Sequence, residues 1–221
     1  MQHIDSGSAL RNFKLTISYD GRQFHGWQIQ NNAMTVQEAF QNALSKIIGS
    51  DFDLNGCSRT DSGVHANMYC ISLKTTHPIA DVRLKAALNR WLPLSIAVLD
   101  CEEVDIDFHA RYSCTSKEYI YKIWNTEVRN PFLDGYALHY RYKLDEQMLN
   151  KAAQAYLVTM KVEADGFLYN MVRIMVGTLL RVQQGKIPVD GITGIIEKKN
   201  RKFAGPTAQP CGLYLNRVNY D

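Results

Sequence analysis

Residues 59–66, with the sequence RTDSGVHA, place a guanidinium, a carboxylate and an imidazole close together in the chain. Gly63 within the segment and Gly56 just before it permit positive φ angles, so the pattern predicts a tight turn with Asp61 at its apex. The neighbouring guanidinium of Arg59 favours the ionised form of Asp61. Asp61 therefore suits a nucleophile or a base better than a proton donor, although an isolated R-T-D would equally suit a surface turn with a weak ion pair.

This segment resembles the R-T-D-A-G-V-H-A signature of the tRNA pseudouridine synthase A (TruA) family, with Ser62 at the usual alanine. The resemblance extends from about Asn12 through nearly the whole chain. Further motifs similar to those of the family occur in the family's order: Tyr19-Asp20-Gly21, Gly26-Trp27-Gln28, Val36-Gln37-Glu38, Asp107-Phe108-His109-Ala110-Arg111, Asn170-Met171-Val172-Arg173 and Gly212-Leu213.

The resemblance implies an isomerase that converts uridine to pseudouridine in the anticodon stem-loop of tRNA, at tRNA positions 38–40. It implies a homodimer that holds tRNA across both subunits and needs neither a metal nor another cofactor. In such an enzyme Asp61 is the essential nucleophile, and attack on C6 of the base or on C1′ of the sugar both remain open.

Three further residues of the expected catalytic site follow from the resemblance. Arg59 would help to fix the loop and hold the target strand. Tyr119 would stack on the target base, although Tyr121 lies on the same face of its strand and periodicity cannot choose between the two. Arg173 would pair with Asp61, since an ionised arginine in an apolar helix needs a partner; the alternative is that its side chain extends to water.

The remaining expected substrate contacts are polar or aromatic side chains suited to phosphates and to a flipped base: Arg22, Trp27, Gln28, His65, His109 and Arg111. Trp27 could instead belong to the core, and His65 fits a structural role in the loop better than a catalytic one. Residues 198–202 form the densest basic run, which suits either a solvated helix end or a phosphate contact.

The elements that must position these residues show clear periodicity. Apolar residues alternate over 13–19, which predicts a strand, and Thr35 with Glu38 predicts a capped helix that ends before Gly49. Further strands are expected from about 52, and over 68–73, 96–104, 119–123, 158–164 and 213–220. Further helices are expected from Asp81 to Pro93 (with Leu84, Ala87, Leu88 and Trp91 on one face), from Asp145 to Leu157, and over 166–184 and 190–198.

These elements predict an α+β fold in which two similar α/β halves share a mixed, mostly antiparallel central sheet with helices packed on one side, as in the pseudouridine synthase fold. Residues 1–11 are expected to be a disordered tail or an expression remnant, residues 12–130 the half with the catalytic loop, and residues 131–221 the other half. A helix and a strand meet at Leu157 and Val158 without a connection, and the resemblance lapses there. We therefore predict that a segment is missing between these two residues.

The overall composition excludes few classes of function. The net charge of +3 does not by itself demand a polyanionic partner. Five cysteines without a C-x-x-C pair favour free thiols in a reducing cytoplasm. No signal peptide or membrane-spanning run is visible, and no histidine–cysteine–aspartate cluster has the spacing of a metal site. Two rival hypotheses remain open: a non-catalytic tRNA-binding or folding module, and a metal-dependent hydrolase that uses Asp61 and His65.

Overall fold

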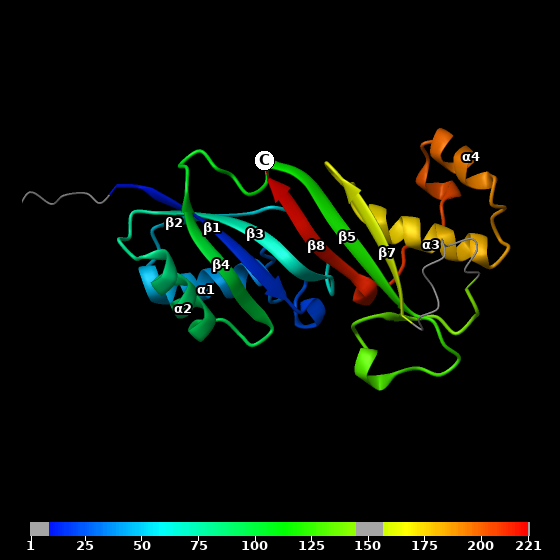
Figure 1. The fold of residues 1–221 in the computed structure, drawn as a ribbon, viewed down its shortest axis with the longest axis horizontal. Helices are drawn as coiled ribbons and strands as arrows, with labels where there is room; N and C mark the ends of the chain where they lie inside the picture. Colours follow the sequence, from blue (N-terminus) through cyan, green and yellow to red (C-terminus); the bar gives the residue numbers. More distant parts are fainter. Residues whose placement is uncertain (1–8, 145–156, 221) are drawn as a thin grey trace, which may run out of the picture. The chain divides into compact units, whose positions relative to one another are not determined.

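The computed structural model describes residues 9–144 and 157–220, and the chain divides into two compact units (Figure 1). The first unit comprises residues 1–117 with 215–221, and the second comprises residues 118–214. The boundary expected after residue 130 thus falls inside the second unit. Arg11, which we assigned to the tail, is instead the first residue of strand β1 (Arg11–Tyr19).

The first unit is built on β1, which pairs antiparallel with β3 (His65–Thr75) and with β4 (Ile96–Val104). Strand β2 (Phe52–Gly56) pairs antiparallel with residues 71–75 of β3, on the edge opposite β1. The period-two pattern of β1 is confirmed, because its alternate apolar side chains are fully buried: Phe13, Leu15 and Ile17.

Two helices contact each other in this unit, α1 (Val36–Ile48) and α2 (Asp81–Trp91). The predicted cap of α1 is present, since the Thr35 hydroxyl accepts the N–H of Glu38 at 3.3 Å. The helix ends at Gly49, whose φ of 80° favours glycine.

The predicted apolar face of α2 is only partly correct. Leu84 and Leu88 are fully buried, but Trp91 is 51% exposed. Trp91 is the last residue of the helix, and its ring packs under the ammonium of Lys46 at 4.9 Å instead of entering the core.

Strands β5 (Cys114–Trp124) and β8 (Leu213–Tyr220) each have residues in both units. The strand order is β4-β1-β3-β8-β5-β6, and β7 (Leu157–Ala164) pairs with β5. Strand β6 (Leu138–His139), which the sequence did not reveal, pairs parallel with the end of β5. The predicted mixed, mostly antiparallel sheet is confirmed.

The second unit also contains the helices α3 (Met171–Gln183) and α4 (Gly191–Glu197). We expected α3 to begin at Gly166, but it begins five residues later because Asn170 has a left-handed φ of 57°. Short 3₁₀ turns complete the two units: Gly21–Gln23 (η1), Pro131–Leu133 (η2), Arg201–Phe203 (η3) and Pro210–Gly212 (η4).

The predicted junction of helix and strand at residue 157 is only partly described. The helix expected from Asp145 lies outside the described residues, apart from Leu157, which begins strand β7 instead of ending a helix. The alternation expected over residues 158–164 is present, since the apolar side chains are half-buried and the intervening polar ones exposed. The missing segment stays a prediction.

No helix in the described ranges is both long enough and apolar enough to cross a membrane. The five cysteines are free thiols; Cys57, Cys70 and Cys101 are buried, and Cys114 and Cys211 are half-buried.

Candidate active site

The loop that contains Asp61 closes as a tight turn in the first unit. The N–H of Val64 donates to the carbonyl oxygen of Asp61 at 3.2 Å, and Gly63 has the positive φ of 76° that this turn needs. The predicted turn is confirmed, but Asp61 is its first residue, with Ser62 and Gly63 at the apex. His65 and Ala66, which we expected in the loop, already belong to strand β3.

Backbone hydrogen bonds fasten this loop to the segment after β1. The N–H of Gly63 donates to the carbonyl of Phe24, and the N–H of Trp27 donates to the carbonyl of Thr60, both at 3.2 Å. The loop therefore keeps its position through main-chain contacts on both sides of Asp61.

Two glycines allow this close approach. A side chain at Gly26, whose φ is 85°, would overlap the carbonyl oxygen of Thr60, and one at Gly21 would overlap the carbonyl oxygen of Val64. These are positions at which only a residue without Cβ permits the contact. The glycines of the Tyr-Asp-Gly and Gly-Trp-Gln motifs thus seat the loop that contains Asp61.

Two buried side chains support the loop from within. The hydroxyls of Tyr19 and Thr60 lie 2.8 Å apart in a buried hydrogen bond. His65 is 1% exposed, and its Nδ1 lies 3.3 Å from both the backbone nitrogen of Gly21 and Oδ1 of Asp20. An unprotonated Nδ1 accepts from Gly21, whereas a protonated one donates to Asp20. Either state connects the loop to the segment after β1. Because His65 is buried, direct contact between its ring and a substrate is disfavoured.

The acid and the arginine of the motif differ in exposure. Asp61 is half-buried, whereas Arg59 is exposed. The ion pairs of the described residues include none between the two. Arg59 therefore does not make the contact with Asp61 that the sequence suggested, and its side chain is exposed to solvent.

Three further expected substrate contacts lie in the segment after β1. Trp27 is 4% exposed and stacks on the ring of Tyr69 with centroids 4.3 Å apart, so it belongs to the core, the alternative that the sequence left open. Gln28 is exposed. Arg22 is exposed and donates Nε and Nη2 to the carboxylate of Asp20 at 2.9 and 2.7 Å.

The Asp-Phe-His-Ala-Arg motif forms a turn at the end of the first unit's sheet. The half-buried ring of His109 accepts the N–H of Arg111 at 3.1 Å through Nδ1 and packs against Tyr112 at 4.3 Å. Arg111 and Tyr112 are exposed. Of the two expected contacts in this motif, Arg111 is thus available to a ligand, and His109 shapes the turn.

Tyr119 and Tyr121 lie on the same face of β5 but have different surroundings in the second unit. Tyr121 is fully buried, and its hydroxyl donates to the carbonyl of Gln209 at 2.7 Å; burial raises its pKa above the usual value. Tyr119 is 7% exposed and meets Phe167 edge to face at 5.1 Å. Its ring is therefore part of an aromatic pair next to the loop that precedes α3.

Arg173 is held in the first turn of α3 by contacts at two points. Its Nε donates to the carbonyl of Ala208 at 2.7 Å, and its Nη1 donates to Oδ1 of Asn170 at 2.9 Å. The N–H of Ala208 returns a hydrogen bond of 3.0 Å to the carbonyl of Arg173. Arg173 as a whole residue is half-buried, which is less than the apolar sequence around it suggested.

Asn170 is a site residue that sequence reasoning missed. Its left-handed φ of 57° ends the loop before α3 and turns its amide oxygen toward Arg173. Asparagine is one of the few residues that adopt this conformation readily, and Asn170 also begins the Asn-Met-Val-Arg motif, so the sequence offered two signals. Asp61 and Arg173 belong to different units, so their predicted ion pair stays a prediction.

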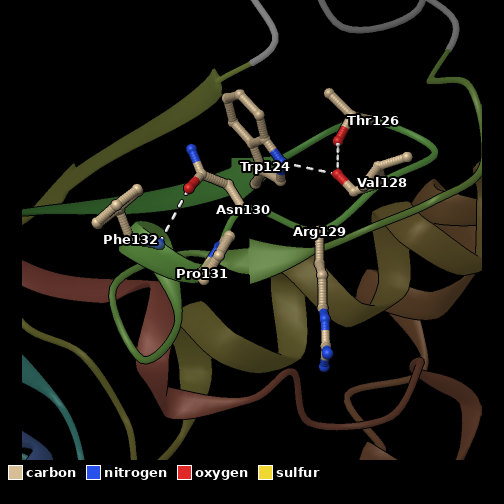
Figure 2. Close-up of a pocket in the computed structure, with 7 residues that line it drawn as sticks. All are labelled: Trp124, Thr126, Val128, Arg129, Asn130, Pro131 and Phe132. Atoms are coloured by element: carbon tan, nitrogen blue, oxygen red, sulfur yellow. Dashed lines mark hydrogen bonds between the residues drawn. The ribbon is translucent and has the colours of Figure 1, made fainter.

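A hollow of about 460 Å³ opens in the second unit beside residues 124–132 (Figure 2). Its lining contains none of the expected site residues. Trp124 follows Tyr119 by an odd number of positions in β5 and so faces the other side of the sheet. Figure 2 shows Arg129 extending away from Trp124 and Phe132, which leaves the hollow largely apolar. We assign the site chemistry to the loops and not to this hollow.

The comparisons with known proteins agree in family. A family model described as tRNA pseudouridine synthase matches residues 15–113 and 136–221. The chain is similar to tRNA pseudouridine synthase A of Acetivibrio thermocellus, with 41% identity over 244 aligned residues that cover 96% of this chain and all of the relative. Similar proteins include tRNA pseudouridine synthase A of Thermoanaerobacter sp. (39%) and tRNA pseudouridine synthase A 2 of Bacillus cereus (35%), each with the same coverage.

The alignments are longer than this chain. They extend over 244 to 245 residues, against 221 in the chain, so the relatives contain residues with no counterpart here. The alignments leave open whether those residues fall between Leu157 and Val158.

Proposed function

The chain belongs to the tRNA pseudouridine synthase family, and we propose that it isomerises uridine to pseudouridine in the anticodon stem-loop of tRNA, at tRNA positions 38–40. The observation that supports this most directly is the seating of the Asp61 loop by Gly21 and Gly26. A carboxylate on a loop fixed by main-chain contacts is preorganised for attack, which lowers the cost of reaching the reactive geometry.

The proposed chemistry is an internal rearrangement. Asp61 forms a bond to C6 of the base or to C1′ of the sugar, the N1–C1′ bond breaks, the uracil turns, and C5 bonds to C1′. The bond to Asp61 breaks again in this sequence, which returns the free carboxylate. The proton on C5 then leaves, and N1 gains one, so no oxidant or reductant is consumed. Tyr119 would stack on the uracil through a ring already oriented by Phe167.

Arg173 is proposed to pair with Asp61 when the site is assembled. Its fixed guanidinium supports this role, because two neutral acceptors, Asn170 and Ala208, already define its plane. A guanidinium at that place would favour the ionised carboxylate. Arg59, Arg22 and Arg111, all exposed, are proposed to contact tRNA phosphates.

The test is release of tritium from tRNA labelled at C5 of uracil. Asp61→Asn and Asp61→Ala are expected to lower the rate by at least about 10³-fold while tRNA binding persists. Asp53→Asn removes an exposed carboxylate of strand β2 in the same unit and serves as the matched control, with a rate close to that of the parent protein. Activity that survives in the Asp61 variants would reject Asp61 as the nucleophile.

The two rival hypotheses give different outcomes in the same assay. A non-catalytic tRNA-binding module releases no tritium even in the parent protein. A metal-dependent hydrolase loses activity to a chelator, whereas the rearrangement is expected to proceed unchanged with a chelator present. The described residues contain no cluster of three or more histidine, cysteine or carboxylate side chains suited to a metal ion.

The cytoplasmic location and the homodimer are also proposals. Free thiols in every cysteine fit a reducing compartment. Light scattering of the purified protein, with and without tRNA, measures whether two copies associate.

A further inference from the structure

A cationic surface follows helix α4 in the second unit. Residues 198–220 contain five basic side chains and no acidic one. Four of these cations lie within residues 198–202, interrupted only by Asn200, and all four are exposed. We name these four residues the basic turn: Lys198, Lys199, Arg201 and Lys202. None of the ion pairs among the described residues involves the basic turn. Unneutralised like charges repel one another, and this repulsion is relieved when an anion binds.

The basic turn has a defined local shape. Oδ1 of Asn200 accepts the N–H of Lys202 at 3.0 Å and so begins the 3₁₀ turn η3. The ammonium of Lys198 packs over the ring of Phe203 at 4.3 Å. Arg201 donates to the carbonyl of Ala204 at 3.4 Å. The side chains of Lys198 and Arg201 thus contact neutral partners, which hold these two cations without cancelling their charge.

The segment that follows the basic turn is docked closely on α3. The N–H of Gly205 donates to the hydroxyl of Thr178 at 2.9 Å. A side chain at Gly177 would overlap the carbonyl oxygen of Pro206. Ala208, three residues after Gly205, both accepts a hydrogen bond from the Arg173 side chain and donates one to the Arg173 carbonyl. In Figure 1 the chain after α4 runs back to α3 within this unit. The basic turn and the guanidinium of Arg173 are therefore held at a fixed distance from each other.

We propose that the basic turn binds backbone phosphates of the tRNA substrate. This inference rests on the proposed function, because it takes tRNA as the ligand of the same protein. Exposed cations on a segment of fixed position contact phosphates without sequence preference and set the register of a bound nucleic acid. The docking on α3 then sets how far the bound phosphates lie from Arg173. The basic turn thus positions the RNA relative to Arg173 of the same unit.

The test measures the salt dependence of tRNA binding. In the full chain, Lys198→Gln, Lys199→Gln and Lys202→Gln are combined, and Arg201 is kept because it also shapes the turn. Each lysine that lies on a duplex phosphate contributes about 0.9 to the slope of log K against log salt. The triple variant is expected to lower the magnitude of the slope by about 1 to 3 and to weaken binding at least about fivefold at 0.1 M salt.

Two controls make this outcome specific. The triple Lys→Arg variant at the same positions keeps the charge and is expected to restore the slope. A variant with Lys46→Gln, Arg83→Gln and Arg90→Gln removes three exposed cations from the first unit and is expected to keep the parent slope. An unchanged slope in the glutamine variant of the basic turn, or an equal loss in the control, would overturn the inference. The proposed function would still stand if the parent protein releases tritium, and it fails separately if the parent releases none.

Discussion

The Asp61 loop and the Arg173 anchor are fixed by different kinds of contact. The loop is held by main-chain hydrogen bonds and by glycines that permit overlap-free approach, at Gly21 and Gly26. Arg173 is held by its own side chain, which donates to Asn170 and Ala208. A change that displaces Asp61 should therefore also destabilise the fold around its loop. A change that displaces the Arg173 side chain should leave the fold intact.

The largest effect is expected from Gly26→Ala. Gly26 has a φ of 85°, and the added methyl group would overlap the carbonyl of Thr60. We therefore expect the free energy of unfolding to fall by at least about 3 kcal/mol and the activity to be lost. Gly49→Ala is the matched control, since Gly49 also has a positive φ but has open space around it. Its expected cost is about 1–2 kcal/mol, from backbone strain alone. Urea unfolding measures both, and equal costs would show that close approach to the loop does not matter.

The Arg173 anchor is expected to respond in activity more than in stability. Arg173→Lys loses the planar fork that meets two acceptors, so we expect kcat to fall about 100-fold with a small change in unfolding free energy. Asn170→Gly keeps the left-handed backbone but removes the acceptor, and a fall of about tenfold is expected. Asn170→Asp keeps the acceptor and should retain most of the activity. Parent-like kcat in Asn170→Gly would remove Asn170 from the positioning of Arg173.

A smaller effect is expected for the buried hydroxyl pair beneath the loop. Thr60→Val removes the partner of the Tyr19 hydroxyl and should cost about 1–2 kcal/mol of unfolding free energy. Tyr19→Phe combined with Thr60→Val should cost less than the two single changes added together, with a coupling of about 1 kcal/mol. Additive costs in this double-mutant cycle would show that the hydroxyl pair does not stabilise the loop.

The prediction with the least bearing on activity and stability concerns thiol reactivity, which compares the burial of cysteines in the two units. Burial raises the pKa of Cys70 to about 11 and that of Cys101 to about 12, so both stay protonated at pH 8. We expect alkylation of these two thiols to be roughly 100-fold slower in the folded than in the unfolded protein. Cys211 of the second unit is half-buried and is expected to react before them, as mass spectrometry of modified peptides would show.

The sequence predicted most of the regular elements, because their patterns are local. The strand at residues 13–19 and the helix capped by Thr35 follow from side-chain period and capping chemistry, and both are present. The parallel pairing of β6 with β5 was not predictable in this way, since two residues give no period. The late start of α3 was missed because apolar residues before Asn170 resembled helix, while the backbone there turns left-handed.

The sequence suggested candidate site residues but few of their contacts. The resemblance proposed Asp61, Tyr119 and Arg173 as catalytic residues, and these roles stay predictions. A core position for Trp27 and a structural role for His65 were alternatives, and the structure shows that both residues are buried. The spacing of the motif also suggested Arg59 as the cation beside Asp61, but Arg59 faces solvent. Which side chains of a short motif turn inward depends on the segment packed against it, and that segment lies about 40 residues earlier in the chain.

Strand β8 has a consequence for biosynthesis. The hydroxyl of Tyr220 donates to the carbonyl of Ala110 at 2.7 Å, and Asn216 accepts from Asn67 at 2.6 Å, so residues 215–220 complete the first unit. During synthesis the amino-terminal half leaves the ribosome before these residues do. Until they follow, strand β3 lacks its partner β8, and this unpaired edge is where we would expect a chaperone to act.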